Sequence, residues 1–147
     1  MALTPAKTSW TLERDLHQVQ AVTVPVRDLA MQFLDADDAA SVELALVEAV
    51  TNAIKHGSIN GRDTGQITVT AMADEGRFVV DVVDNVPVVP KDALDRARKR
   101  GASFDIDDIA GLEESGRGLS IMILSMDEII LSTANDKYIL SMVKYIP

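Results

Sequence analysis

The chain has 147 residues, of which 47% are apolar and only 4% aromatic, as expected for one domain with an aliphatic core. Its formal net charge of −9 argues against direct binding to nucleic acid or to an anionic membrane surface, because both attract basic proteins. The absence of cysteine excludes disulfides, thiol nucleophiles and thiolate metal sites, and the two histidines exclude a histidine-rich metal site.

The first half of the chain predicts one strand followed by two helices. Weak alternation over residues 9–15 predicts the strand, and apolar residues at helical spacing predict a helix over residues 16–34. Pro25 lies inside that helical stretch, so we expect a kink or a late helix start there. A second helix is predicted over residues 37–56, with Gly57 as its left-handed end.

The second half predicts two hairpins, with a long loop and a helix between them. Residues 66–84 and 127–146 each alternate as two strands around a tight turn, and residues 118–126 have the pattern of a buried helix. The segment 85–117 has little regular pattern apart from one short helix, "ALDRARKR", and loops of this length are usually functional lids or disordered. This order of elements predicts an α/β two-layer sandwich, with a mixed, mostly antiparallel sheet and helices on one face.

Neither a secretory signal pattern nor an apolar run of the ~20 residues that cross a bilayer is present, so we expect a cytoplasmic protein that does not bind membranes. The acidic charge fits a basic protein partner or a metal-bound nucleotide better than nucleic acid.

Glu48 and Asn52 are the first candidate functional residues. They stand one helical turn apart, so the carboxylate and the amide share a face of the predicted helix. Lys55 and His56 follow one turn later and either lie near a ligand or form a solvated helix end. The plain alternative for the whole face is a surface helix with a polar outside.

Two further segments add to this face. Asp84 ends the very apolar strand "VVDVVD", and "ESGRGLSIM" (residues 114–122) brings a Gly-x-Gly to the start of a predicted helix. Gly116 and Gly118 allow the backbone to approach a ligand closely, and the amides of a helix start favour an anion such as phosphate. Each signal alone is weak, because an aspartate after a strand usually forms a turn. Their order and spacing carry the hypothesis.

In this order the motifs resemble those of the GHKL (Bergerat-fold) ATPase superfamily and, within it, the anti-sigma factor serine/threonine-protein kinases of bacteria. The segment "ELALVEAVTNAIKHG" matches the N-box of that family, and "ESGRGLSIM" matches its second glycine box. The resemblance covers about residues 9–145. It implies a single ATP-binding domain over residues 1–147 with the histidine-kinase-like ATPase fold and an ATP lid at about residues 86–116.

The resemblance also implies a role for each motif residue. Asn52 would be the Mg²⁺ ligand at the nucleotide, and Glu48 would be the base that accepts a proton from the attacking hydroxyl. Asp84 would accept the exocyclic amino group of adenine. The phosphates would be held by the second glycine box, which comprises Gly116, Arg117, Gly118 and Leu119.

The first glycine box of the family, Asp-x-Gly-x-Gly, reads "DNVPV" in this chain. Val86 and Val88 replace the glycines, with Pro87 between them. Valine disfavours the positive φ that glycine allows, so we expect a different loop path and a narrower adenine pocket, with phosphates and metal supplying more of the binding. The usual Gly-Thr near the last strand is also replaced, by "TANDKY".

The resemblance implies a regulatory serine-protein kinase that uses ATP and Mg²⁺, sequesters a sigma factor or similar regulator, phosphorylates a STAS-domain antagonist on serine, and possibly forms a homodimer. The alternative is a non-catalytic partner-binding module of the same fold with weakened or lost nucleotide binding. Intact Glu48 and Asn52 favour the enzyme, whereas Val86 and Val88 favour the alternative. An unrelated globular domain is the third hypothesis.

Overall fold

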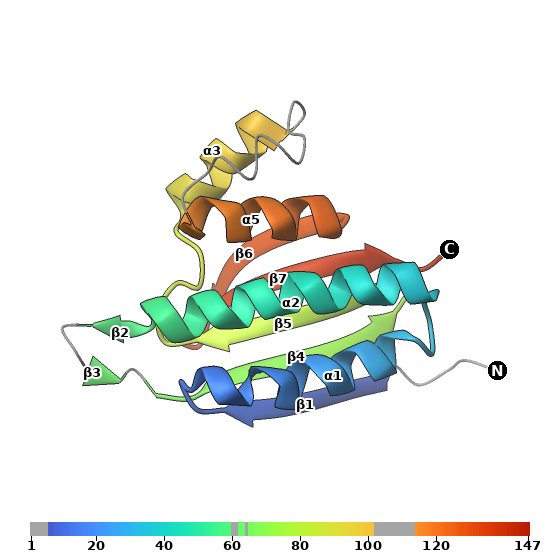
Figure 1. The fold of residues 1–147 in the computed structure, drawn as a ribbon, viewed down its shortest axis with the longest axis horizontal. Helices are drawn as coiled ribbons and strands as arrows, with labels where there is room; N and C mark the ends of the chain where they lie inside the picture. Colours follow the sequence, from blue (N-terminus) through green and yellow to red (C-terminus); the bar gives the residue numbers. More distant parts are fainter. Residues whose placement is uncertain (1–5, 60–61, 64, 102–113) are drawn as a thin grey trace.

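A computed structural model describes residues 6–59, 62–63, 65–101 and 114–147 of the chain (Figure 1). A five-stranded sheet in the order β1-β4-β5-β7-β6 carries helices on one face (Figure 1). The predicted two-layer α/β sandwich is therefore confirmed. Each pair of neighbours among the described strands is antiparallel, so this sheet lacks the parallel pair that a mixed sheet would contain.

The chain runs through its elements in an order that matches the predicted one, with a 3₁₀ turn and a short two-stranded ribbon added. In sequence they are β1 (Ala6–Leu12), η1 (Leu16–Gln18), α1 (Val19–Ala30), α2 (Ala36–His56), β2 (Ser58–Ile59), β3 (Arg62–Asp63), β4 (Ile67–Asp74), β5 (Arg77–Asp84), α3 (Lys91–Gly101), α5 (Glu114–Ser125), β6 (Glu128–Ala134) and β7 (Lys137–Tyr145).

The first helical segment starts as η1 and continues as α1. The Asp15 carboxylate caps η1 by accepting the N–H of His17 at 2.9 Å. The sequence predicts a kink or a late helix start at Pro25, and because α1 runs through Pro25, the late start is wrong. Proline removes one backbone N–H from a helix, but the fully buried Val22 and Val26 hold α1 against the core.

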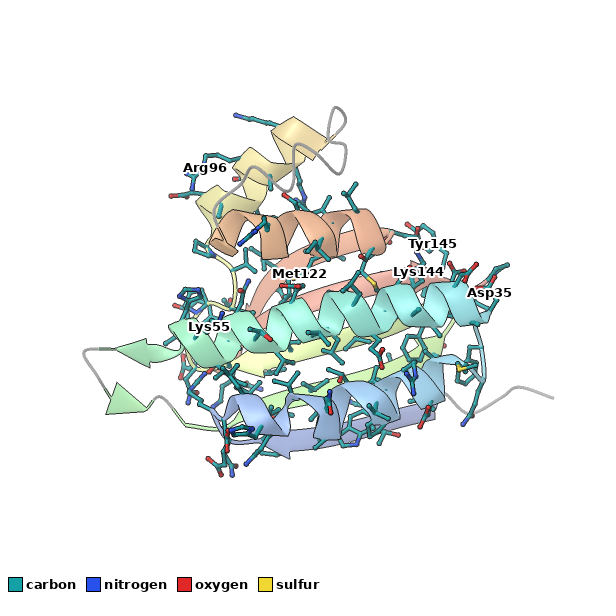
Figure 2. The ribbon with its side chains drawn as sticks, in the orientation of Figure 1. Asp35, Lys55, Arg96, Met122, Lys144 and Tyr145 are labelled. Atoms are coloured by element: carbon teal, nitrogen blue, oxygen red, sulfur yellow. The ribbon has the colours of Figure 1, made fainter. Side chains whose placement is uncertain are left out.

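Helix α2 begins within one residue of its predicted start, because the Asp35 carboxylate accepts the N–H of Asp38 at 2.8 Å. Asp35 and Lys55 mark the two ends of the helix in Figure 2. The predicted left-handed end is wrong, since Gly57 has φ −81° and ψ 4°. Any residue can adopt that conformation, so glycine is needed here for another reason, which lies in the packing described below.

Both predicted hairpins are confirmed, and each closes with a two-residue turn. Glu75 and Gly76 have φ values of 50° and 77°, and Asn135 and Asp136 have 53° and 63°. Positive φ at both central residues is the geometry that matches the twist of antiparallel strands. The long β4–β5 hairpin thus leads directly to Asp84 at the end of the sheet's central strand.

The second layer places α5 beside α2, and α3 against α5 (Figure 1). Met122 of α5 is fully buried and lies towards α2 (Figure 2). The predicted short helix is confirmed as α3, which occupies the first part of the predicted lid; residues 102–113 of that lid lie outside the described residues. Within the ranges that the structure covers, no helix is long and apolar enough to cross a membrane.

Candidate functional site

The structure brings the two strongest predicted segments together where α2 meets α5. A Cβ atom added to Gly118 would lie 2.9 Å from Glu48 Oε2 and 3.7 Å from Asn52 Oδ1. Glu48 and Asn52 are half-buried and share the face of α2 towards Gly118. The Glu48 carboxylate and the side-chain amide of Asn52, whose Nδ2 would lie 3.8 Å from the same Cβ atom, therefore converge on a point of backbone that carries no side chain.

Helix α5 begins at Glu114, four residues earlier than predicted. Gly116 and Gly118 lie within its first turns, since glycine inside a helix costs only about 1 kcal/mol relative to alanine. Leu119 is buried in the core, whereas Arg117 is exposed.

This junction fits the phosphate and metal end of Mg-ATP. An amide oxygen is a hard ligand of the kind that Mg²⁺ accepts beside phosphate oxygens and water. The missing Cβ of Gly118 lets the Glu48 carboxylate and the Asn52 amide lie directly against the backbone of α5. Asn52, Glu48 and Gly118 are the residues that would hold this end.

The other end of the predicted site has a different environment. Asp84 is 1% exposed and forms a two-pronged ion pair with Arg14, which follows β1. Arg14 Nη1 donates to Asp84 Oδ2 at 3.0 Å and to the carbonyl oxygen of Ala53 at 2.7 Å, and Nη2 donates to Asp84 Oδ1. The Asn85 N–H also donates to Oδ1, at 2.7 Å. The carboxylate predicted to read adenine is thus occupied by a guanidinium.

Gly57 is the residue that makes room for this ion pair. A Cβ atom at Gly57 would overlap with the guanidinium of Arg14 and with the carbonyl oxygen of Ala53. Helix α2 therefore ends in glycine because Arg14 passes its last turn on the way to Asp84. Consecutive residues of α2 serve the two ends of the site: Asn52 lies near Gly118, and the Ala53 carbonyl accepts from Arg14.

The "DNVPV" segment packs inward. Val86 and Val88 are 9% and 4% exposed, and neither has a positive φ. The backbone at these two valines therefore does not adopt the positive φ that glycine would allow, as expected from their side chains. Val88 and Pro87 form one wall of a cavity of about 340 Å³, and residues 131–133 and 138–140 of the last hairpin form the other. Lys137 of that hairpin donates to the side chain of Asn85.

Comparison with known proteins places this arrangement in a family. Residues 12–144 match the family described as the Histidine kinase-like ATPase domain. The chain belongs to this family. It is 30% identical over 93 residues to the serine-protein kinase RsbW of Bacillus licheniformis, a match that covers 63% of this chain and 56% of that relative.

A crystal structure of the RsbU and RsbW domains of Rv1364c from Mycobacterium tuberculosis has the same fold, with a TM-score of 0.59 and 20% identity. The match covers 96% of this chain and 32% of that one. The chain thus spans about half the length of RsbW and a third of the crystallised chain that holds the RsbU and RsbW domains. The range that matches the histidine kinase-like ATPase domain contains α2, α5 and most of the sheet.

Two predicted residues, Lys55 and His56, remain at the C-terminal end of α2. Lys55 and His56 are exposed in the last turn of the helix, as expected for a solvated helix end. Arg14 is a member of this site that the sequence did not reveal. It is one of 14 basic residues, it belongs to no motif, and its partner Asp84 is 70 positions away, so no local pattern marks it.

Proposed function

We propose that this histidine kinase-like ATPase domain is a regulatory serine-protein kinase. It binds Mg-ATP, sequesters a sigma factor or similar regulator, and phosphorylates a STAS-domain antagonist on serine. One observation carries the proposal: Glu48 and Asn52 converge on Gly118 at the α2–α5 junction. The similarity to the serine-protein kinase RsbW supports the same reaction class.

Each residue of the junction has one task in this proposal. Bound Mg-ATP supplies the phosphoryl group for transfer. Asn52 offers its amide oxygen to the metal, and Gly118, which has no side chain, lets Asn52 and Glu48 lie against the start of α5. Glu48 accepts the proton of the attacking serine hydroxyl, as its carboxylate lies one helical turn from Asn52 on the same face. Gly116, Arg117 and Leu119 belong to the same turns of α5 and complete the phosphate end.

The partners in this proposal are proteins. The net charge of −9 supports a partner with a basic surface and opposes direct contact with nucleic acid. Sequestration and phosphorylation would then use different partner proteins, one held and one modified.

A second candidate is a partner-binding module that does not transfer phosphate. The observations in its favour are the Arg14–Asp84 ion pair and the buried Val86 and Val88, because they occupy the base end of the site. In this case the α2–α5 junction would have kept its shape without carrying out chemistry.

Labelled phosphate separates the two candidates. The purified protein is mixed with Mg-ATP labelled at the γ-phosphate and with the STAS-type protein encoded nearest to it. The kinase predicts label on that partner, and none when the accepting serine of the partner is replaced by alanine. A complex that forms without label in the partner supports the binding module and contradicts the kinase.

A further inference from the structure

The interaction between Arg14 and Asp84 is a built site and not a surface contact. The two side chains are 5% and 0% exposed, and two segments distant in sequence, the end of α2 and the end of β5, contact the guanidinium. Arg14 comes from the end of β1, Ala53 supplies a carbonyl oxygen at 2.7 Å, and Gly57 supplies the space. A charged pair at this depth keeps its geometry because separating it would leave two unpaired buried charges.

The acceptor capacity of Asp84 is nearly used. Its two oxygens already accept two N–H groups of Arg14 and the backbone N–H of Asn85. A carboxylate has about four acceptor positions, and the remaining one lies in a side chain that is closed to solvent. An incoming amino group would have to displace a guanidinium, whose charge-assisted hydrogen bonds are roughly twice as strong as neutral ones.

The guanidinium presents to Asp84 the same chemistry that an aminopurine would, namely N–H donors in a plane. Resting on the proposed Mg-ATP binding, we infer that Arg14 takes the place of the base amino group at Asp84, so that this chain binds nucleotides through phosphate and metal without distinguishing the base. Arg14 is then a specificity-determining residue of the site. The buried Val86 and Val88 act in the same direction by filling the neighbouring loop.

The test compares two nucleotides that differ at this position. Inosine triphosphate carries a carbonyl oxygen where ATP carries the amino group, and both have the same phosphates. Dissociation constants for the two Mg²⁺ complexes are measured by titration calorimetry on the wild type and on Arg14→Gln. We expect the wild type to bind both nucleotides with affinities within about threefold, because the phosphate end is common to them. We expect Arg14→Gln to prefer ATP by roughly tenfold or more, the scale of one hydrogen bond to a charged group.

A matched control replaces the pair by two neutral amides. Arg14→Gln/Asp84→Asn removes the carboxylate as well, so the preference for ATP gained by Arg14→Gln should disappear. If Arg14→Gln alone is too unstable for calorimetry, the same comparison is made by thermal unfolding, where ATP should raise its Tm more than the same concentration of inosine triphosphate does. Arg14→Lys, which keeps the charge but has only one donor group, should show a smaller preference.

The outcomes separate this inference from the proposed function. A wild type that binds ATP and rejects inosine triphosphate by more than about tenfold overturns the inference and leaves Mg-ATP binding intact. The same holds if Arg14→Gln binds both nucleotides equally. A wild type that binds neither nucleotide, with an Arg14→Gln variant that binds ATP, overturns the inferred base-independent binding, although it leaves the α2–α5 junction as a nucleotide site. Absence of binding by both proteins overturns the inference and the proposed function together.

Discussion

Gly118 of α5 lies so close to Glu48 of α2 that a methyl group added to it would stand 2.9 Å from the carboxylate oxygen Oε2. That distance is too short for a carbon and an oxygen that are not bonded, so the carboxylate would have to move. The far end of a glutamate side chain can swing away at little cost to the fold. The glycine therefore controls where the carboxylate points more than it controls stability.

Gly118→Ala should change the position of the Glu48 carboxylate without lowering the stability of the fold. Alanine favours the helix by about 1 kcal/mol over glycine, so the free energy of unfolding should stay level or rise. Phosphotransfer should fall by up to ~10²-fold, because the carboxylate is displaced from its position. Thermal unfolding and transfer of labelled phosphate measure the two effects. Leu124→Ala, at a 52% exposed position of the same helix, is the control and should retain transfer.

Asn52→Ala should weaken binding of Mg-ATP by roughly tenfold, the scale of one lost contact to a charged group. Nucleotide titrations with Mg²⁺ and with a chelator measure the effect. In the chelator the wild type and the variant should bind ATP alike, since the lost contact is to the metal. Equal Mg-ATP affinities for both proteins would remove Asn52 from the site.

Glu48→Gln should leave nucleotide affinity unchanged and slow phosphotransfer by ~10²-fold or more, the range for loss of a general base. The amide has the shape of the carboxylate but cannot accept the hydroxyl proton. Single-turnover transfer and equilibrium binding are measured on the same preparation. A variant that transfers phosphate at the wild-type rate would show that Glu48 is not the base.

Gly57→Ala should destabilise the protein by about 3 kcal/mol or more, because its Cβ would push Arg14 away from Asp84 and leave a buried charge unpaired. Gly76→Ala is the matched comparison. Gly76 has φ 77° but open space around its Cα, so it should lose only about 1–2 kcal/mol to backbone strain. Urea unfolding of both variants measures the difference. A smaller loss for Gly57→Ala than for Gly76→Ala would contradict the packing role of Gly57.

The Tyr145 hydroxyl donates to Glu128 Oε2 at 2.7 Å, and this hydrogen bond raises the pKa of Tyr145 above its usual 10.0. Because the folded-state pKa is raised, the bond's contribution to stability is complete below pH 10.0 and is lost as the pH rises through the folded-state pKa. Absorbance titration in a Tyr138→Phe background follows Tyr145 alone, since the chain has two tyrosines. Adding Glu128→Ala should lower this pKa.

The sequence predicted the type and order of the main elements because helical and strand periods differ along the chain. The start of α2 was within one residue of its prediction, since Asp35 provides a local cap. The start of α5 differs from its prediction, because the Gly-x-Gly was expected to lead into the helix, whereas both glycines lie inside a helix that packs against α2 and includes Glu114. Local signals therefore located the ends that local hydrogen bonds determine.

One part of the candidate site could be predicted from local spacing, and the other part could not. Glu48 and Asn52 share a face by helical spacing alone, so the sequence could predict that they act together. The pairing of Arg14 with Asp84 depends on how β1, α2 and β5 are arranged in space, and no spacing along the chain encodes it. For the same reason Gly57 was assigned to backbone conformation when its role is to leave room for a side chain.

The pairing of β1 with β4 has a consequence for how the chain folds. The β4–β5 and β6–β7 hairpins can close locally, whereas β1 must wait until both α1 and α2 have been made before β4 exists as its partner. Closing that long loop is entropically unfavourable until other contacts are in place. During synthesis β1 therefore leaves the ribosome before its partner β4 exists, and the guanidinium of Arg14 stays hydrated until β5 brings Asp84 to it.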